Sequence, residues 1–332
     1  MKLSVTDSHP LRSGFRDMGA VLAVASAMTG ATALTMPCPS DGGGDLAFTR
    51  YTADQIIEDV YTVETDGTGL FQVTTDLTVS DVDPSWSPDG EWLAFHRAGA
   101  VNGIWIARAD GTDLQPVPNT AGGRSAAWSP DGDRIAFART GPGPDTELYV
   151  IDLDGTDLVQ LTLNRVDDLA PAWSPDGASL VFTREAAAGE ATDLWRVDDD
   201  GSDPVQIVAT PGWESSPDWS PDGTRIAYYR WDAGDGAHLR TIAPDGTGDV
   251  QVTNGRTNEY DPAWSPDGTR IAFVRGDDDE LAPRHVWTVA AAGGDEVQVT
   301  DGDVVDFHPD WRAAPGGFGG RGSFTSAGGG RS

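Results

Sequence analysis

The sequence contains one cysteine, Cys38, and one lysine, Lys2, among its 332 residues. A lone cysteine cannot form a disulfide within the chain or supply a cysteine-based zinc site. Basic residues are scarce overall, because 22 arginines and lysines stand against 53 aspartates and glutamates, for a formal net charge of −31. Nucleic-acid binding depends on cationic side chains, so this balance argues against a nucleic-acid partner.

Long apolar runs are also missing after the first forty residues. A membrane-spanning helix needs roughly 20 consecutive apolar residues, so we expect no such helix in the body of the protein. The acidic, lysine-poor composition fits either a GC-rich coding bias or adaptation to high salt, and the sequence leaves both open. In either case the surface charges repel one another at low ionic strength, and we expect added salt to stabilise the protein.

Residues 1–38 have the order of a signal peptide. Lys2, Arg12 and Arg16 precede an uncharged stretch rich in Ala, Val and Leu, which ends near an A-x-A sequence at residues 31–33. We therefore expect a periplasmic or secreted protein. Cys38 offers an alternative, a lipid anchor, but Pro37 stands where that signal needs a small residue.

The string WSPDG recurs five times and marks an internal repeat. It begins at Trp86, Trp128, Trp173, Trp219 and Trp264, and a sixth tryptophan, Trp311, follows 47 residues after the last. Each unit continues with an apolar run such as RIAFAR, a variable loop, a second apolar run, a turn that is DG in four of the five units, and a short run such as VQLT. Pro, Asp and Gly favour tight reversals of the chain, so each unit predicts four short antiparallel strands.

A unit of about 45 residues cannot bury both faces of such a sheet alone, so we expect the units to stack radially as propeller blades. Three strand-like runs (DLAFTR, DVYTVETDG and LFQVT) precede the first WSPDG, and only the run around Trp311 follows the last full unit. We therefore predict an all-β fold over residues 39–312: a six-bladed β-propeller with four-stranded antiparallel blades, whose last blade joins three N-terminal strands to one C-terminal strand. Residues 313–332 are rich in glycine and are predicted to form a disordered tail.

The repeated pattern W-S-P-D-G-x-x-I-A-F resembles the TolB-type, WD40-like propeller repeat, over about residues 45 to 312. The resemblance implies an exported six-bladed propeller that acts as a non-catalytic protein-binding module in the cell envelope or extracellular space. Some similar propellers precede α/β-hydrolase domains, but this sequence has no G-x-S-x-G motif.

Strand direction places the SPDG and DG turns on one face, which we call the turn face. The loops that enter the first strands, or join second to third strands, lie on the other, variable face; because these loops differ between units, we expect them to bind a partner. Trp213 and Trp231 lie there outside the repeat positions and are candidate anchors. Carboxylates gather at the same rim and are candidates for binding a basic segment of a protein partner: Asp83, Asp168, Glu214, Glu259, Asp261 and Asp306.

An arginine ends the second strand of every unit: Arg50, Arg97, Arg139, Arg184, Arg230 and Arg275. Sixfold repetition within one chain favours a structural role, because a ligand site needs only one or two blades. We expect a girdle of arginine–carboxylate pairs that links adjacent blades. A ring of arginines for an anionic ligand is the alternative.

The sequence contains only weak metal-binding and catalytic motifs, compared with the clear propeller repeat. The acidic string from Asp152 to Asp157 resembles the start of an EF-hand loop, but Leu163 stands where that loop needs a glutamate. We expect no cofactor; calcium at the acidic channel mouth is the alternative, with no ligands assigned. We expect a monomeric, non-catalytic binding module; the alternative is a propeller hydrolase or lyase that acts on a sugar or peptide with a channel-bound metal.

Overall fold

The computed structural model describes residues 44–52, 57–141, 143–186, 191–277 and 282–313. The predicted targeting segment with Cys38, residues 39–43 and the predicted tail beyond Ala313 lie outside these ranges. The described residues form 24 strands and no helix, which confirms the all-β prediction. No helix long and apolar enough to cross a membrane is found in this part of the chain.

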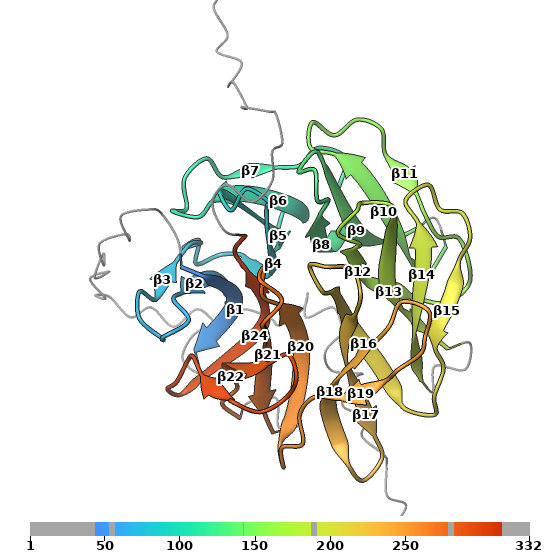
Figure 1. The fold of residues 1–332 in the computed structure, drawn as a ribbon. Helices are drawn as coiled ribbons and strands as arrows, with labels where there is room; N and C mark the ends of the chain where they lie inside the picture. The colour runs from blue at the N-terminus through green and yellow to red at the C-terminus, as the bar shows by residue number, and fades with distance from the viewer. Residues whose placement is uncertain (1–43, 53–56, 142, 187–190, 278–281, 314–332) are drawn as a thin grey trace, which may run out of the picture.

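The strands form four-stranded antiparallel sheets, as predicted (Figure 1). One sheet contains β24 (Val304–Trp311), β1 (Leu46–Thr52), β2 (Asp59–Val63) and β3 (Phe71–Gln72). The next contains β4 (Ser80–Trp86), β5 (Trp92–Ala98), β6 (Gly103–Arg108) and β7 (Gln115–Pro116). A third contains β8 (Gly123–Trp128), β9 (Arg134–Thr140), β10 (Thr146–Asp152) and β11 (Val159–Gln160). A fourth contains β20 (Asn258–Trp264), β21 (Arg270–Gly276), β22 (His285–Ala290) and β23 (Val297–Gln298).

The remaining eight strands are two successive meanders of the same kind. The first contains β12 (Asp168–Trp173), β13 (Ser179–Glu185), β14 (Thr192–Asp198) and β15 (Val205–Val208). The second contains β16 (Trp213–Trp219), β17 (Ile226–Asp232), β18 (Gly236–Ile242) and β19 (Val250–Gln251). A single parallel bridge between Thr192 and Trp213 joins the two meanders into one eight-stranded sheet.

The inner strands of the sheets contact one another in a closed order. β4 contacts β8, and the contacts continue through β12, β16, β20 and β24 back to β4. Figure 1 shows these strands nearest the common centre, with the short strands β3, β7, β11 and β15 farther out. The sequence of the inner strands therefore decides which side chains meet at the centre of the molecule.

Tight turns join the inner strand to the second strand of each meander. In the turn after Trp86, the Gly90 amide donates to the Ser87 carbonyl at 2.8 Å, and the Ser87 hydroxyl donates to Asp89 Oδ1 at 2.6 Å. Gly90 has a φ of 69°, a conformation that costs glycine little. The WSPDG string thus acts through local hydrogen bonds, which is why it marks the strand boundaries so regularly.

The hydrophobic core lies between neighbouring sheets. Leu93, Ala94 and Phe95 in β5 are all fully buried, because the middle strands are covered on both faces. One core cluster combines Ile104 of β6 with Ile135 and Phe137 of β9, so adjacent sheets bury each other's apolar faces. A single sheet would leave such residues exposed to water.

Candidate partner-binding face

Four of the six predicted arginines pair with a carboxylate on the inner strand of their own sheet. Arg50 donates from Nε and Nη2 to the two oxygens of Asp306 at 2.6 and 2.9 Å. Arg97 pairs with Asp81 and Arg184 with Asp168 in the same two-point manner, and Arg275 pairs with Glu259 at 2.7 Å. The two partners lie opposite each other on neighbouring strands. The expectation that these ion pairs link adjacent sheets is therefore wrong.

Threonine side chains make the link between sheets instead. Thr300, which follows β23, donates its hydroxyl to Asp306 of β24 at 2.5 Å and accepts the Val286 amide of its own sheet at 2.8 Å. Thr253, which follows β19, makes the same short contact with Glu259 of β20. Each of these carboxylates therefore holds an arginine of its own sheet and a threonine of the preceding one.

Aromatic rings support five of the six guanidinium groups. Arg184 lies 5.1 Å from the ring centroid of Phe182 and 4.5 Å from that of Trp195 on the third strand. Arg139 stacks in the same way, 5.6 Å from Phe137 and 4.2 Å from Tyr149. The cation–π contacts fix the orientation of the guanidinium plane.

Arg230 departs from this arrangement. The residue opposite Tyr228 on its third strand is Arg240, where the other sheets place an aromatic residue. Arg230 turns to Asp232, 2.8 Å away, instead of Glu214, although Glu214 lies opposite it in β16. Glu214 Oε2 is left buried without a hydrogen-bond partner among the described residues, and burial raises the pKa of Glu214 to about 7.

Most of the carboxylates predicted to bind a partner are not accessible. Asp168, Glu214, Glu259 and Asp306 are each 0 % exposed. Asp168, Glu259 and Asp306 bind side chains of the same chain, and Glu214 is buried, so none of the four can contact a partner at the surface. The sequence predicts that these carboxylates lie at the rim of the variable face. It does not show that the folded chain buries them.

The two candidate tryptophans also differ from expectation. Trp213 and Trp231 lie opposite each other on β16 and β17. Trp213 is only 8 % exposed, so the prediction that it is an exposed anchor is wrong. Trp231 is half-buried and packs against the core cluster that contains Tyr229, so it stays partly accessible.

Asp83 and Asp261 are the two candidate carboxylates that reach solvent, and His308 lies between them. Their side chains are 21 % and 16 % exposed. His308 Nδ1 lies 2.8 Å from Asp83 and Nε2 lies 3.6 Å from Asp261, so β24 is tied to β4 on one side and β20 on the other. The surrounding protein would lower the pKa of His308, but the two carboxylates outweigh this effect and raise it to about 10. His308 is therefore a cation at neutral pH.

All six inner strands share a backbone feature at this level. One residue of each has a positive φ, and the pairing register shifts there: Asp83, Ser125, Ala170, Ser216, Asp261 and His308. Five of the six precede a proline. This recurring residue before proline is a sequence signal that could have identified His308 as a neighbour of Asp83 and Asp261.

The sequence did not predict a role for two further, half-buried carboxylates, Asp218 and Asp310. Asp218 Oδ2 accepts the Trp264 amide and Asp310 Oδ2 accepts the Trp86 amide, each at 2.6 Å, so β16 is bonded to β20 and β24 to β4. Burial raises the pKa of Asp218 to about 7 and that of Asp310 to about 6. Both occupy the position before the repeated tryptophan, where other units have Ser or Ala.

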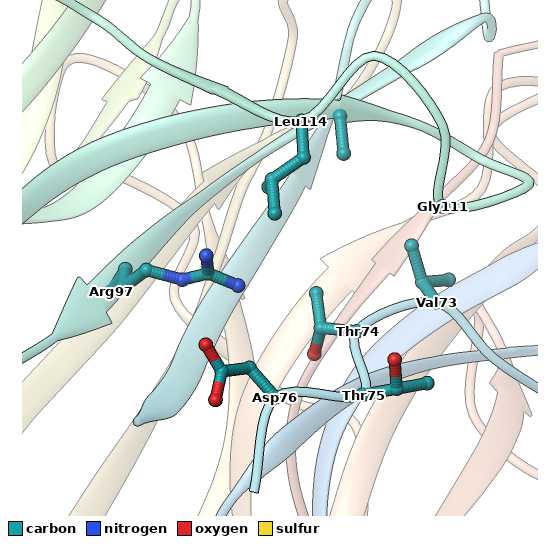
Figure 2. A pocket seen from close by; sticks show the side chains of 8 residues that line it. Val73, Thr74, Thr75, Asp76, Arg97, Gly111 and Leu114 are labelled. Atoms are coloured by element: carbon teal, nitrogen blue, oxygen red, sulfur yellow. The ribbon is translucent and has the colours of Figure 1, made fainter. Parts of the chain in front are cut away.

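No group of three or more His, Cys, Asp or Glu side chains suited to a metal ion occurs in the part of the chain that the structure describes. The expectation of no cofactor, with calcium as the alternative, stays a prediction. A small pocket of about 160 Å³ lies between the sheet of β3 and the sheet of β7 (Figure 2). Figure 2 shows Arg97, Thr74 and Asp76 around it, with Leu114 on the opposite side. Because Arg97 already holds Asp81, this pocket is a gap between sheets rather than a separate ligand site.

Comparison with known proteins identifies the fold. Residues 183–332 match the family model of the TolB beta propeller domain. TolB from Acinetobacter baumannii superposes with a TM-score of 0.69 at 17 % identity, over 83 % of this chain and 68 % of that one. A TolB-type structure from Agrobacterium tumefaciens gives 0.65 at 19 % identity, over 80 % of this chain and 98 % of that one. A chain of the nidogen/laminin complex gives 0.64 at 10 % identity, over 81 % and 98 %.

No curated protein matches the sequence at a significant level. The sequence repeat, the family match over the C-terminal part and the superpositions nevertheless agree with one another. This chain therefore has a TolB-like β-propeller fold, and its residues 183–332 match the TolB beta propeller domain family.

Proposed function

We propose that this protein is a six-bladed propeller that binds another protein through its variable face and carries out no catalysis. The closed order of inner-strand contacts and the pairing of β24 with β1 support six blades joined at the two ends of the described chain. A ring of this kind holds its loops on a rigid frame, which suits recognition. The turn face offers the same short turns in every blade and is the weaker candidate.

The observation that carries this proposal is the accessibility of Asp83, Asp261 and Trp231, while the other candidates are buried. An aromatic ring inside a polar rim is the usual composition of an interface hot spot. Asp83 and Asp261 together carry two negative charges against the single positive charge of His308. The surplus charge and the net charge of −31 favour a partner with a basic segment.

We also propose that the protein acts in the periplasm or outside the cell as a monomer. The order of charges and apolar residues in residues 1–38 supports export. Fractionation of cells that express the full chain tests this point. A mature protein recovered without its first residues, outside the cytoplasm, is the expected result.

Partner binding is tested by co-purification from the native cell envelope, followed by titration of variants. We expect Trp231→Ala combined with Asp261→Asn to raise the Kd at least tenfold while far-UV circular dichroism stays unchanged. The matched control is Asp110→Asn combined with Asp154→Asn, two exposed turn-face residues, which should leave the Kd unchanged. A larger loss from the control pair would mean that the turn face binds the partner.

The alternative of a metal-dependent hydrolase or lyase is tested on the same purified protein. Elemental analysis that finds a stoichiometric ion, lost when Asp83 or Asp261 is replaced by Asn, would favour the enzyme. The binding-module proposal expects no ion that depends on these two side chains.

A further inference from the structure

We propose that Arg139 binds the side-chain carboxylate of an aspartate supplied from outside the chain. The inference is independent of the partner site proposed above. Four other sheets show how an arginine at this position binds a carboxylate. In each of them the carboxylate belongs to the same chain. Three of these four ligands are aspartates: Asp306, Asp81 and Asp168.

At Arg139 the internal ligand is missing. The residue opposite it on β8 is Gly123, which has no side chain. Among the described residues, no carboxylate oxygen lies within 4.0 Å of the Arg139 guanidinium, whereas Arg50, Arg97, Arg184 and Arg275 each have one. This sheet therefore has the repeated arginine but lacks the inner-strand carboxylate that binds it in the other four sheets.

Glu147 lies opposite Arg139 on the other neighbouring strand, β10, and is the nearest internal substitute in register. Its oxygens are already occupied. Glu147 accepts the Thr162 hydroxyl at 2.8 Å, the Asn164 amide at 2.7 Å and the Asn164 side chain at 3.2 Å. Turning Glu147 toward Arg139 would break three hydrogen bonds that satisfy a side chain only 3 % exposed.

Two contacts fix the position of the Arg139 guanidinium and leave two of its donor groups for a ligand. Its centre lies 4.2 Å from the Tyr149 ring centroid, and Nη1 donates to the Asn119 carbonyl at 3.0 Å. The other two donor groups, Nε and Nη2, are the ones that Arg50, Arg97 and Arg184 use for their aspartates. The side chain is half-buried, so a ligand from solvent can reach it with little loss of side-chain entropy.

The local charge also differs from the rest of the protein. Arg124, which follows Gly123 in β8, donates from Nη2 to the Thr146 hydroxyl, and its Nε has no hydrogen-bond partner among the described residues. This sheet thus presents two arginines without carboxylate partners in a chain whose net charge is −31. The two arginines attract an incoming carboxylate, and Glu147 is the opposing charge nearest in register.

The test is a nuclear magnetic resonance titration of the arginine Nε–Hε groups in the full chain with the peptide acetyl-Gly-Asp-Gly-amide. We expect a saturable shift of the Arg139 resonance and no shift of Arg184, whose donors already hold Asp168. The peptide with Asn in place of Asp should cause no shift. An unmoved Arg139 resonance, or an equal response to the Asn peptide, would overturn the proposal.

The source of the carboxylate is tested with acetyl-Gly-Gly, whose one carboxylate is the chain terminus. A much smaller shift than with the Asp peptide is expected. An equal shift would overturn the assignment to a side chain. Arg139→Lys should reduce the affinity for the Asp peptide at least tenfold, measured on amide resonances near Tyr149, and an unchanged affinity would show that Arg139 is not the receptor.

Gly122 provides a matched pair of variants. A Cβ on Gly122 would lie 3.9 Å from Arg139 Cγ with nothing else within 4 Å, and its φ of 76° is one that Asp and Asn tolerate better than most residues. Gly122→Asp should supply an internal carboxylate and abolish the peptide-induced shift. Gly122→Asn carries the same backbone strain without the charge and should preserve it. Identical behaviour of the two variants would contradict the proposal.

Discussion

Arg50 and Asp306 are 256 positions apart in the sequence, yet they form a buried two-point ion pair. Arg50 belongs to β1 and Asp306 to β24, which lie side by side (Figure 1). Beyond this pair, Asp310 of the same strand accepts the Trp86 amide, and Arg312 donates to the Gly90 carbonyl. The last described strand and the residue after it therefore bond both to the first described strand and to the sheet of β4.

This relationship predicts opposite outcomes for two truncations. Deleting residues 305–332 removes Asp306 and Trp311 and exposes the edges of β1 and the neighbouring sheets, so we expect loss of cooperative unfolding. Deleting residues 316–332 leaves all of β24 in place and should change the melting temperature little. Differential scanning calorimetry of both proteins checks this, and equal melting temperatures would contradict a structural role for β24.

Paired and unpaired arginines should respond differently to truncation. Arg184→Ala leaves the fully buried Asp168 without its ion-pair partner, so we expect the free energy of unfolding to fall by about 1–3 kcal/mol. Arg139→Ala removes no ion pair from the chain and should cost less. Urea unfolding of the two variants measures the difference, which should persist at 1 M salt because the Arg184 pair is largely shielded from water. If Arg139→Ala lowers the free energy of unfolding more than Arg184→Ala does, the buried ion pair is not the stronger contribution and the interpretation of both arginines is wrong.

The strands were predictable because their signals are local. The turn residues that follow Trp86 form hydrogen bonds within six positions of one another, and the apolar second strands are buried on both faces. The candidate site was less predictable because its properties depend on register. Whether Glu259 faces solvent or Arg275 is decided by strand pairing and by Thr253 from the preceding sheet, which the spacing of the repeat does not reveal.

Trp213 illustrates the same limit. Its position outside the repeat suggested an exposed anchor, but it pairs with Trp231 across two strands and becomes buried. His308 shows the reverse case. No role was predicted for it from the sequence, and the closed order of inner strands brings it between two aspartates.

The free energy of unfolding should rise as the pH falls from 8 to 5.5. Burial raises the pKa of Glu214 and Asp218 to about 7 and that of Asp310 to about 6, above the values of an unfolded chain. The native state therefore binds these protons more tightly than the unfolded state, and the stabilisation is lost as the pH rises through 6 to 7. The midpoint of urea unfolding, measured across this range at constant ionic strength, should move to lower urea as the pH increases.

Two variants test whether Glu214 and Asp218 cause the higher stability at low pH. Glu214→Gln and Asp218→Asn cannot ionise, so each should flatten the pH dependence between 5.5 and 8. Asp154→Asn, which alters an exposed turn-face carboxylate, is the matched control and should keep the wild-type slope in this range. A wild-type midpoint that rises from pH 5.5 to 8 would show that other groups dominate.

His308 should act as a fixed positive charge between Asp83 and Asp261. With a pKa of about 10, its imidazole proton resonances should show no titration between pH 5 and 8. His308→Gln leaves the two carboxylates without a cation, so we expect a lower melting temperature at low salt and partial recovery in high salt, where their repulsion is screened. Adding Asp83→Asn to His308→Gln removes one of the repelling charges. The double variant should therefore be more stable than the sum of the two single losses predicts, and simple additivity would show that the 2.8 Å contact between His308 and Asp83 contributes nothing to stability.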